Sequence, residues 1–294
     1  MADKSAGNTQ TVAERLRSYR SVMTTAELAI ASELMGNYPV SGLLPIVQLA
    51  AKAGVSAPTV TRLITKLGYS GYSAFHDALR QEVQARMFSP LDVYPEEEKA
   101  DTDPVSRAAS SYIASITSTF QHIDNRDVKA AVAALADPAR NVSLMGGRYS
   151  HVLARHLGAY LSLLRTGVSV VPADSGGRIG SLVDLGDRSV VVVYDFRRYQ
   201  QVSVDWGVAA LKRGAFLIVV TDQYLSPLSS QADALLTANT AGVEPFDSMT
   251  GAFAVTEMLI SEVARSIGTN ARDRLADYER LQIKEEDPRI RRRP

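Results

Sequence analysis

The segment LLPIVQLAAKAGVSAPTVTRLITKLGYSGY, residues 43–72, decides the fold of the N-terminal part of the chain because it predicts two helices joined by a tight turn. Its first part, LLPIVQLAAKA, carries Leu44, Val47 and Ala51 at helical spacing. Gly54 then stands where the turn between the helices requires a positive φ, which glycine adopts at little cost. The segment therefore predicts a helix-turn-helix unit.

The second helix of the pair begins after Ser56, a good N-cap residue, and tolerates Pro58 because the first helical turn does not need its missing N–H. Its apolar residues fall at i, i+3, i+4 and i+7 and predict one buried stripe: Val60, Leu63, Ile64 and Leu67. The opposite face carries small or polar side chains and one arginine: Ala57, Pro58, Thr61, Arg62 and Thr65. In a helix-turn-helix this face enters the major groove of DNA.

The residue types on that face suit DNA recognition. Arg62 can donate two hydrogen bonds to a guanine edge, and threonine side chains can contact phosphates or pyrimidine methyl groups. Lys66, like Lys52, is expected to contact the DNA backbone. The predicted DNA contacts are Ser56, Ala57, Pro58, Thr59, Thr61, Arg62, Thr65 and Lys66. The alternative is a helical hairpin with a merely solvated outer face, and the coincidence of turn glycine, cap, stripe and polar face favours the helix-turn-helix.

The rest of the N-terminal region is also helical in pattern. The sequence TTAE at residues 24–27 matches a capping box and predicts a helix that ends near residues 37–39. Residues 1–90 hold nine Lys and Arg against six Asp and Glu, a net charge of +3, although the whole chain is neutral with 32 basic and 32 acidic residues. A local basic surface is therefore available for DNA. We expect an all-α bundle built around the helix-turn-helix.

Composition limits the class of protein. With 294 residues, 46% of them hydrophobic, the chain is long enough for two domains. The absence of cysteine excludes disulfides, thiolate metal sites and cysteine nucleophiles. The polar N-terminus does not resemble a signal peptide, and no apolar run is long enough to span a bilayer. We therefore expect a soluble, cytoplasmic protein that makes no membrane contact.

The second half of the chain has a different pattern. The acidic segment SPLDVYPEEEKADTDP, residues 89–104, carries three prolines and predicts a linker. Beyond it, five apolar runs alternate with helical patterns: VSLM (142–145), VSVV (168–171), SVVVVYDF (189–196), AFLIVVT (215–221) and DALLTA (233–238). This alternation predicts an α/β domain with a parallel sheet flanked by helices. The expected division is a helix-turn-helix domain at 1–88, the linker at 89–104, the α/β domain at 105–280 and a tail at 281–294.

A second candidate site follows the predicted strands, because ligands of open α/β sheets bind beyond the carboxyl ends of the strands. Two glycines and a serine follow the first run and open a helix, which suits an anion, and arginines follow the first and third runs. The predicted effector contacts are Gly146, Gly147, Arg148, Ser150, Asp195, Arg197, Arg198 and Ser226. Consecutive residues of an extended segment point opposite ways, so only one of Arg197 and Arg198 is expected to face the pocket. Alternatively, Ser150 is a plain N-cap, the arginines are structural, and Asp195 pairs with Arg197 or Arg198.

Two stretches, AKAGVSAPTVTRL and LGYSGYSAFHDAL, resemble the N-terminal domain of RpiR-family transcriptional regulators, and the resemblance extends over residues 15–275. It implies that the α/β domain is SIS-like (a sugar isomerase domain) and senses a sugar-related metabolite. Residues 146–154 are similar to the SIS pattern Gly-x-Gly-x-Ser-x-x-x-Ala, with Arg148 in place of the second glycine. The Ser-x-Ser-Gly-x-Thr phosphate cradle of the family is replaced by residues 194–199, YDFRRY. The expected effector is therefore a sugar phosphate or sugar acid held by arginine side chains.

Sequence motifs of catalysis are missing. There is no P-loop, no dinucleotide-binding glycine motif and no nucleophile elbow, and His151 and His156 are five residues apart, which does not suit a zinc pair. We expect no catalytic residues, no cofactor and no metal. Two alternatives stay open: an aldose–ketose sugar-phosphate isomerase, because SIS domains also serve enzymes, and a domain that only oligomerises.

A single helix-turn-helix buries too little surface for tight specific binding, so we expect a homodimer or homotetramer on a double-stranded operator. The helices predicted at 105–136 and 270–284 are the candidate dimer elements. An effector at the sheet edge would then bias the relative placement of the two DNA-binding domains. The basic tail RIRRRP, residues 289–294, is expected to be disordered or to touch DNA phosphates.

Overall fold

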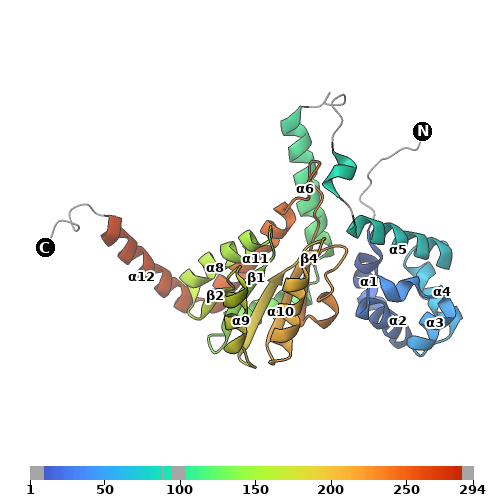
Figure 1. The fold of residues 1–294 in the computed structure, drawn as a ribbon, viewed down its shortest axis with the longest axis horizontal. Coiled ribbons are helices and arrows are strands. Elements are labelled where there is room, and N and C mark those ends of the chain that lie inside the picture. The colour runs from blue at the N-terminus through green and yellow to red at the C-terminus, as the bar shows by residue number, and fades with distance from the viewer. Residues whose placement is uncertain (1–9, 88, 95–102, 287–294) are drawn as a thin grey trace.

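The computed structural model describes residues 10–87, 89–94 and 103–286. A helical bundle contains the first five α-helices, and the residues from α6 onward fold around a five-stranded sheet (Figure 1). Among the described residues, no helix is both long and apolar enough to cross a membrane. The predicted fold class, an all-α bundle followed by an α/β domain, is confirmed.

The bundle consists of five α-helices and two short 3-10 segments: α1 (Val12–Tyr19), α2 (Thr25–Gly36), α3 (Ile46–Lys52), α4 (Ala57–Lys66), α5 (Tyr72–Arg86), η1 (Arg20–Val22) and η2 (Val40–Leu43). The predicted capping box of α2 is confirmed, because the hydroxyl of Thr24 accepts from the backbone N–H of Glu27, whose side chain accepts from the backbone N–H of Thr24. Thr11 and Glu14 form a second capping box at α1.

The apolar stripe of α4 is confirmed, with Val60, Leu63 and Ile64 fully buried. Gly54 has the predicted positive φ, +67°. The prediction for α3 is wrong in two respects. The helix starts only at Ile46, because Pro45 stands at its N-cap in an extended conformation, and its buried residues are Leu49 and Ala50. Val47, one of the apolar residues at helical spacing in the sequence, is 67% exposed.

The five predicted strands are confirmed as β1 (Asn141–Gly146), β2 (Val168–Val170), β3 (Ser189–Tyr194), β4 (Phe216–Asp222) and β5 (Ala234–Ala238). All neighbours pair in parallel, in the order β2-β1-β3-β4-β5. The central strand β3 is buried along its whole length, which explains its unbroken run of apolar residues.

Helices cover both faces of the sheet. One face packs against α7 (Asn125–Ala136), α8 (His151–Leu164) and α11 (Thr250–Ile267), and the other packs against α9 (Ser175–Val183) and α10 (Gln201–Leu211). Alternate residues of β3 serve the two cores: Val192 faces the first and Val193 the second. A 3-10 turn (Ser229–Gln231, η4) precedes β5.

The predicted single helix at 105–136 is wrong: the chain forms α6 (Pro104–His122) and α7 instead. Ile123 is extended, and the carboxylate of Asp124 caps α7, which ends the first helix and starts the second. The C-terminal helix α12 (Thr269–Glu286) projects from the body on the side opposite to the bundle (Figure 1). In the predicted linker, η3 covers Pro90–Val93. The domain boundaries stay predictions, and the basic tail 289–294 lies outside the described residues.

The bundle is docked onto the sheet domain through α1 and α5. Ala13 is buried in the same apolar cluster as α10 and the neighbouring face of the sheet. Arg17 donates to the Leu235 carbonyl at 2.9 Å and to the Thr237 hydroxyl at 3.0 Å, both on β5. Within the bundle, the buried carboxylate of Glu82 accepts hydrogen bonds from the Tyr38 hydroxyl and the Val12 backbone.

This buried carboxylate generates a prediction about pH. Burial raises the pKa of Glu82 from its ordinary value of 4.5 to about 7. Between these values the folded chain holds a proton that the unfolded chain has released, so the free energy of unfolding falls as the pH rises. In Glu82→Gln, the fall between pH 5 and pH 8 should be about 1–3 kcal/mol smaller than in the unmodified chain.

Thermal unfolding at both pH values measures this difference. Asp77→Asn, on the exposed surface of the same helix, is the matched control and should keep the original pH dependence. Equal pH dependence in Glu82→Gln and the unmodified chain would show that Glu82 keeps an ordinary pKa in the folded state.

Candidate functional site

The predicted DNA-binding face lies on the part of the bundle turned away from the sheet, where α3 and α4 are found (Figure 1). Five of the eight predicted contacts are exposed there: Ser56, Pro58, Thr61, Arg62 and Thr65. Ala57 and Thr59 are half-buried beside them. The guanidinium of Arg62 donates to the Thr59 hydroxyl at 3.2 Å, so the arginine lies along the first turn of α4. The structure thus gathers these seven residues on one accessible helical face.

Two residues of this set, Lys66 and Ser56, have side-chain partners within the bundle. Lys66 is bound within the bundle: its ammonium lies 2.9 Å from a Glu27 carboxylate oxygen and donates to the Val22 carbonyl at 2.8 Å. It joins α4 to α2, and a DNA phosphate would have to displace these partners. Ser56 stands at the N-cap position, but its hydroxyl contacts the Thr59 hydroxyl at 2.9 Å instead of capping a backbone N–H.

The second candidate site is a cavity of about 730 Å³ at the carboxyl ends of β1 and β3. Six of the eight predicted effector residues line it: Gly147, Arg148, Ser150, Asp195, Arg197 and Arg198. The register of the sheet brings the two loops together, because Gly146 pairs with Tyr194 at the strand ends. Both Arg197 and Arg198 border the cavity, so the expectation that only one of them faces it is wrong. The backbone of Arg198 is left-handed, with φ of +64°, which breaks the alternation of an extended segment.

The loop after β1 is held by its glycines and its serine. A side chain at Gly146 would place a Cβ 2.6 Å from the Cα of His151, so only glycine allows the chain to turn directly into α8. Ser150 is buried, and its hydroxyl accepts from the Gly147 backbone at 2.8 Å and donates to the Tyr194 carbonyl at 2.7 Å. Ser150 therefore positions the cavity wall by joining the end of β1 to the end of β3.

Asp195 lines the cavity and is hydrogen-bonded to Ser226, which lies outside the lining. The Ser226 hydroxyl donates to Asp195 at 2.5 Å, and the Gln200 backbone donates to its other oxygen at 3.3 Å. Burial raises the pKa of Asp195 to about 6, although both hydrogen bonds favour its charged form. The alternative pairing of Asp195 with Arg197 or Arg198 is thus replaced by pairing with Ser226, which itself does not line the cavity.

The three arginines have different surroundings. The guanidinium of Arg197 forms a two-fold ion pair with the carboxylate of Asp247. Arg148 and Arg198 are exposed, and within the described part of the chain neither guanidinium has a hydrogen-bond or ion-pair partner. Two uncompensated positive charges therefore border the cavity, which suits an anion.

Sequence reasoning missed several lining residues. Tyr199, Gln200, Phe246, Asp247 and Met249 also line the cavity. The last three lie in the connection between β5 and α11. The rule that points to residues after each strand would have indicated this connection if it had been applied to the last predicted strand.

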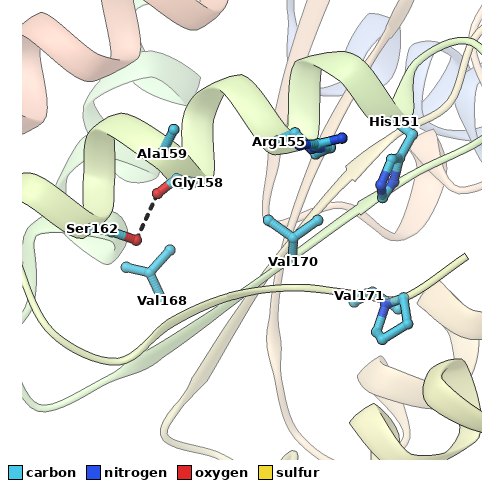
Figure 2. A pocket seen from close by; sticks show the side chains of 9 residues that line it. His151, Arg155, Gly158, Ala159, Ser162, Val168, Val170 and Val171 are labelled. Carbon is cyan, nitrogen blue, oxygen red and sulfur yellow. Dashed lines mark hydrogen bonds between the residues drawn. The ribbon is translucent and has the colours of Figure 1, made fainter.

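A second, open hollow of about 510 Å³ lies between α8 and the edge strand β2. Figure 2 shows His151 and Arg155 projecting from α8 above Val170, with Val168 further along the strand. None of the predicted effector residues lines this hollow. Elsewhere on α8, His156 contacts the carboxylate of Glu257, and neither of these two residues lines the 730 Å³ cavity. No cluster of three or more metal-ligating side chains exists among the described residues.

Comparison with known protein families defines the class of both domains. A model described as "Helix-turn-helix domain, rpiR family" matches residues 10–86, and the SIS domain model matches residues 135–262. The chain thus combines a helix-turn-helix domain of the rpiR family with a SIS domain. This is the domain plan of RpiR-family regulators, and the resemblance inferred from the sequence is confirmed.

Two curated relatives match most of this chain. The chain is 27% identical over 239 residues to the bifunctional protein glk of Paraburkholderia xenovorans and spans 36% of the length of that protein. An HTH-type transcriptional regulator of Clostridium perfringens is 24% identical over 195 residues, which are 66% of this chain and 69% of the relative.

Among solved structures, the sugar isomerase domain of an RpiR transcription factor from Sphaerobacter thermophilus is 26% identical, with a TM-score of 0.56 over 60% of this chain and 98% of that chain. The NanR protein of Vibrio vulnificus, complexed with ManNAc-6P, is 20% identical, with a TM-score of 0.55 over 92% of this chain and 97% of that chain. The second likeness shows that the fold is shared across both domains.

The position of Ser150 generates a prediction about stability. Ser150→Ala removes the hydroxyl that satisfies the Gly147 N–H and the Tyr194 carbonyl, and it should lower the free energy of unfolding by about 1–3 kcal/mol. Thermal unfolding measures this loss as several degrees in Tm. Ser162→Ala, on the same helix, is the control, because the exposed Ser162 hydroxyl bonds only to the Gly158 carbonyl. A Tm loss no larger than that of the control would contradict the positioning role.

Proposed function

We propose that this protein is a transcriptional regulator that binds double-stranded DNA through α4 and an anionic sugar, most simply a sugar phosphate, in the cavity at the carboxyl ends of β1 and β3. The proposal rests on one observation. In this chain, an rpiR-type helix-turn-helix domain is followed by a SIS domain whose cavity is bordered by arginines.

The DNA-binding part is supported by the exposed face of α4. Arg62 and Thr61 are exposed on this face while the opposite stripe is buried, so the helix can enter a major groove without disturbing its packing. Thr59 holds the Arg62 guanidinium near the helix start, the end closest to base edges in this motif. We assign Arg62 to base recognition and leave Lys66 as a structural residue.

The effector part is supported by the chemistry of the cavity wall. Arg148 and Arg198 offer guanidinium donors to a phosphate or carboxylate, and Gln200 offers a polar group to sugar hydroxyls. The aromatic ring of Phe246 and the side chain of Met249 supply apolar surface for the ring of the sugar. The complex of NanR with ManNAc-6P supports a phosphorylated sugar as the class of effector.

We propose no enzymatic activity. Both carboxylates that line the cavity are engaged within the protein: Asp247 pairs with Arg197, and Asp195 accepts from Ser226 and Gln200. An aldose–ketose isomerase needs a base that reaches a bound sugar, and the His156–Glu257 pair does not line the cavity.

We further propose that the protein acts in the cytoplasm as a homo-oligomer, at least a dimer. Apolar side chains stand exposed on α6 and α12, the two regions expected to contact a second copy: Val105, Ile113, Phe120, Tyr278 and Leu281. Such surfaces are usually covered by protein partners.

The DNA-binding assignment predicts the effect of one substitution. Arg62→Ala should weaken binding to a sequence selected from a random double-stranded pool by about 5- to 150-fold, because a bidentate base contact contributes about 1–3 kcal/mol of discrimination. Fluorescence anisotropy measures this affinity. Arg80→Ala, an exposed arginine on α5 that pairs with Asp77, is the matched control and should bind normally. Equal affinities for both variants would show that Arg62 does not contribute to DNA binding.

The effector assignment predicts stabilisation by ligand. A panel of sugar phosphates that includes ManNAc-6P, with sugar acids and neutral sugars, should contain an anionic member that raises Tm in a concentration-dependent way. The expected gain is about 2.7 kcal/mol at a hundredfold excess over Kd. The double variant Arg148→Ala/Arg198→Ala should lose this shift, whereas Arg155→Ala, an exposed arginine of α8 outside the cavity, should retain it. No shift across the panel would contradict the effector site.

A further inference from the structure

The cavity and the DNA-binding bundle share one side chain, Arg197. On one side Arg197 lines the cavity and pairs with Asp247. On the other side its guanidinium donates to the carbonyl of Ala85, in the last turn of α5, at 3.1 Å. A helix C-terminus carries partial negative charge, so the cation is well placed there. The wall of the effector cavity therefore contacts the end of the DNA-binding bundle directly.

Arg86, the last residue of α5, makes the reciprocal contact. Its guanidinium donates to the Tyr224 carbonyl at 2.9 Å and to the Leu225 carbonyl at 2.7 Å, both in the loop after β4. The same guanidinium lies over the Tyr199 ring at 5.5 Å from the centroid, and Tyr199 lines the cavity. Arg86 itself is outside the cavity, so it links the bundle to the cavity wall without forming part of the binding site.

A buried carboxylate connects the two arginine contacts. Asp222, fully buried at the end of β4, accepts from the Tyr199 hydroxyl at 2.7 Å and from the Tyr224 backbone at 2.8 Å. It also accepts from the backbone N–H of Arg197. The loops after β3 and β4 are thus joined through one side chain, so a displacement of either loop is transmitted to the other.

Both loops are held in an unfavourable backbone conformation. Arg198 and Leu225 have φ values of +64° and +65°, a region that residues with a side chain rarely adopt. Arg198 stands between Arg197 and Tyr199, and the carbonyl of Leu225 is an acceptor of Arg86. Strained residues of this kind persist where the surrounding contacts hold them and are frequent at switch regions. Release of the arginine contacts would therefore let both loops relax.

We propose that Arg197 and Arg86, with the carbonyls of Ala85, Tyr224 and Leu225, form a latch that fixes the DNA-binding bundle against the effector cavity and that an anion in the cavity opens. This inference rests on the proposed function of the same cavity and adds how its occupation reaches the DNA-binding domain. The opening follows from competition for Arg197. A phosphate oxygen is a charged acceptor and forms a stronger hydrogen bond than the neutral Ala85 carbonyl, so a bound anion draws the guanidinium away from α5.

The opened state remains folded, because other contacts hold the bundle. Ala13 stays buried in the apolar cluster of the sheet domain, and Arg17 keeps its hydrogen bonds to β5. The latch therefore changes the freedom of α5 relative to the sheet and not the fold of either part. Since α4 is packed against α5, this freedom changes how the recognition helix is presented to DNA.

The test uses backbone hydrogen exchange on the full chain, followed by mass spectrometry. Without any ligand, Arg86→Ala should speed exchange at least tenfold in the peptides that cover residues 80–87 and 220–228, while α8 exchanges as before. Arg80→Ala, on the same helix but paired with Asp77, is the control and should change neither peptide. Arg86→Lys keeps the charge but cannot donate to both carbonyls in the same planar geometry, and it should show the same effect if Arg86→Ala does not fold. Unchanged exchange in a folded Arg86 variant would overturn the latch.

Inorganic phosphate is the probe for the second arm. In the unmodified chain, phosphate should slow exchange in residues 146–152 and speed it in residues 80–87. In Arg86→Ala, phosphate should slow exchange in residues 146–152 and cause a smaller further change at residues 80–87, because only the Arg197 contact to Ala85 is left to break. In the unmodified chain, protection of residues 146–152 without faster exchange in residues 80–87 would overturn the coupling. Absence of protection at the loop would instead contradict the proposed anion site, and the ligand-free arm would still decide whether the latch exists.

Discussion

Six residue pairs align β1 with β3, from Asn141 opposite Ser189 to Gly146 opposite Tyr194. This parallel register is the constraint on which the rest of the structure depends. It ends both strands at the same level, so the loops that follow them face each other across the cavity. Ser150 then secures the junction by bonding to the backbone of Gly147, just after β1, and of Tyr194, the last residue of β3. A shift of one residue would exchange the two faces of β3 and separate the arginines that border the site.

The same strand ends also determine where the helical bundle docks. The loop after β4 supplies a carbonyl acceptor for Arg86, and the loop after β3 supplies Arg197, which donates to a carbonyl at the end of α5. The buried carboxylate of Asp222 joins the two loops. The proposed function requires an effector site and a DNA-binding site whose states depend on each other. One arginine, Arg197, belongs both to the cavity and to the contact with α5.

Much of the fold could be predicted because its signals are local. The glycine turn, the capping box at Thr24 and the apolar stripe of α4 each depend on neighbouring residues, and the unbroken valine run of β3 follows from burial on both faces. Errors arose where local signals compete. Pro45 delayed the start of α3, and Asp124 divided the helix predicted at 105–136. The positions of Gly146 and Ser150 were predicted from the strand-to-helix pattern, but not the bonds that Ser150 makes.

The sequence by itself therefore determined the two domain types, the order of elements and the residues that stand at the strand ends, because periodicity, capping and turn chemistry act over a few residues. Only the tertiary structure decided which partners these residues take. Lys66 pairs with Glu27, Arg197 pairs with Asp247, and Arg86 reaches the loop after β4. These partners lie between 39 and 139 positions away in the chain. Hydrogen bonds and ion pairs depend on distances of about 3 Å, and no pattern of nearby residues fixes such a distance between segments so far apart in sequence.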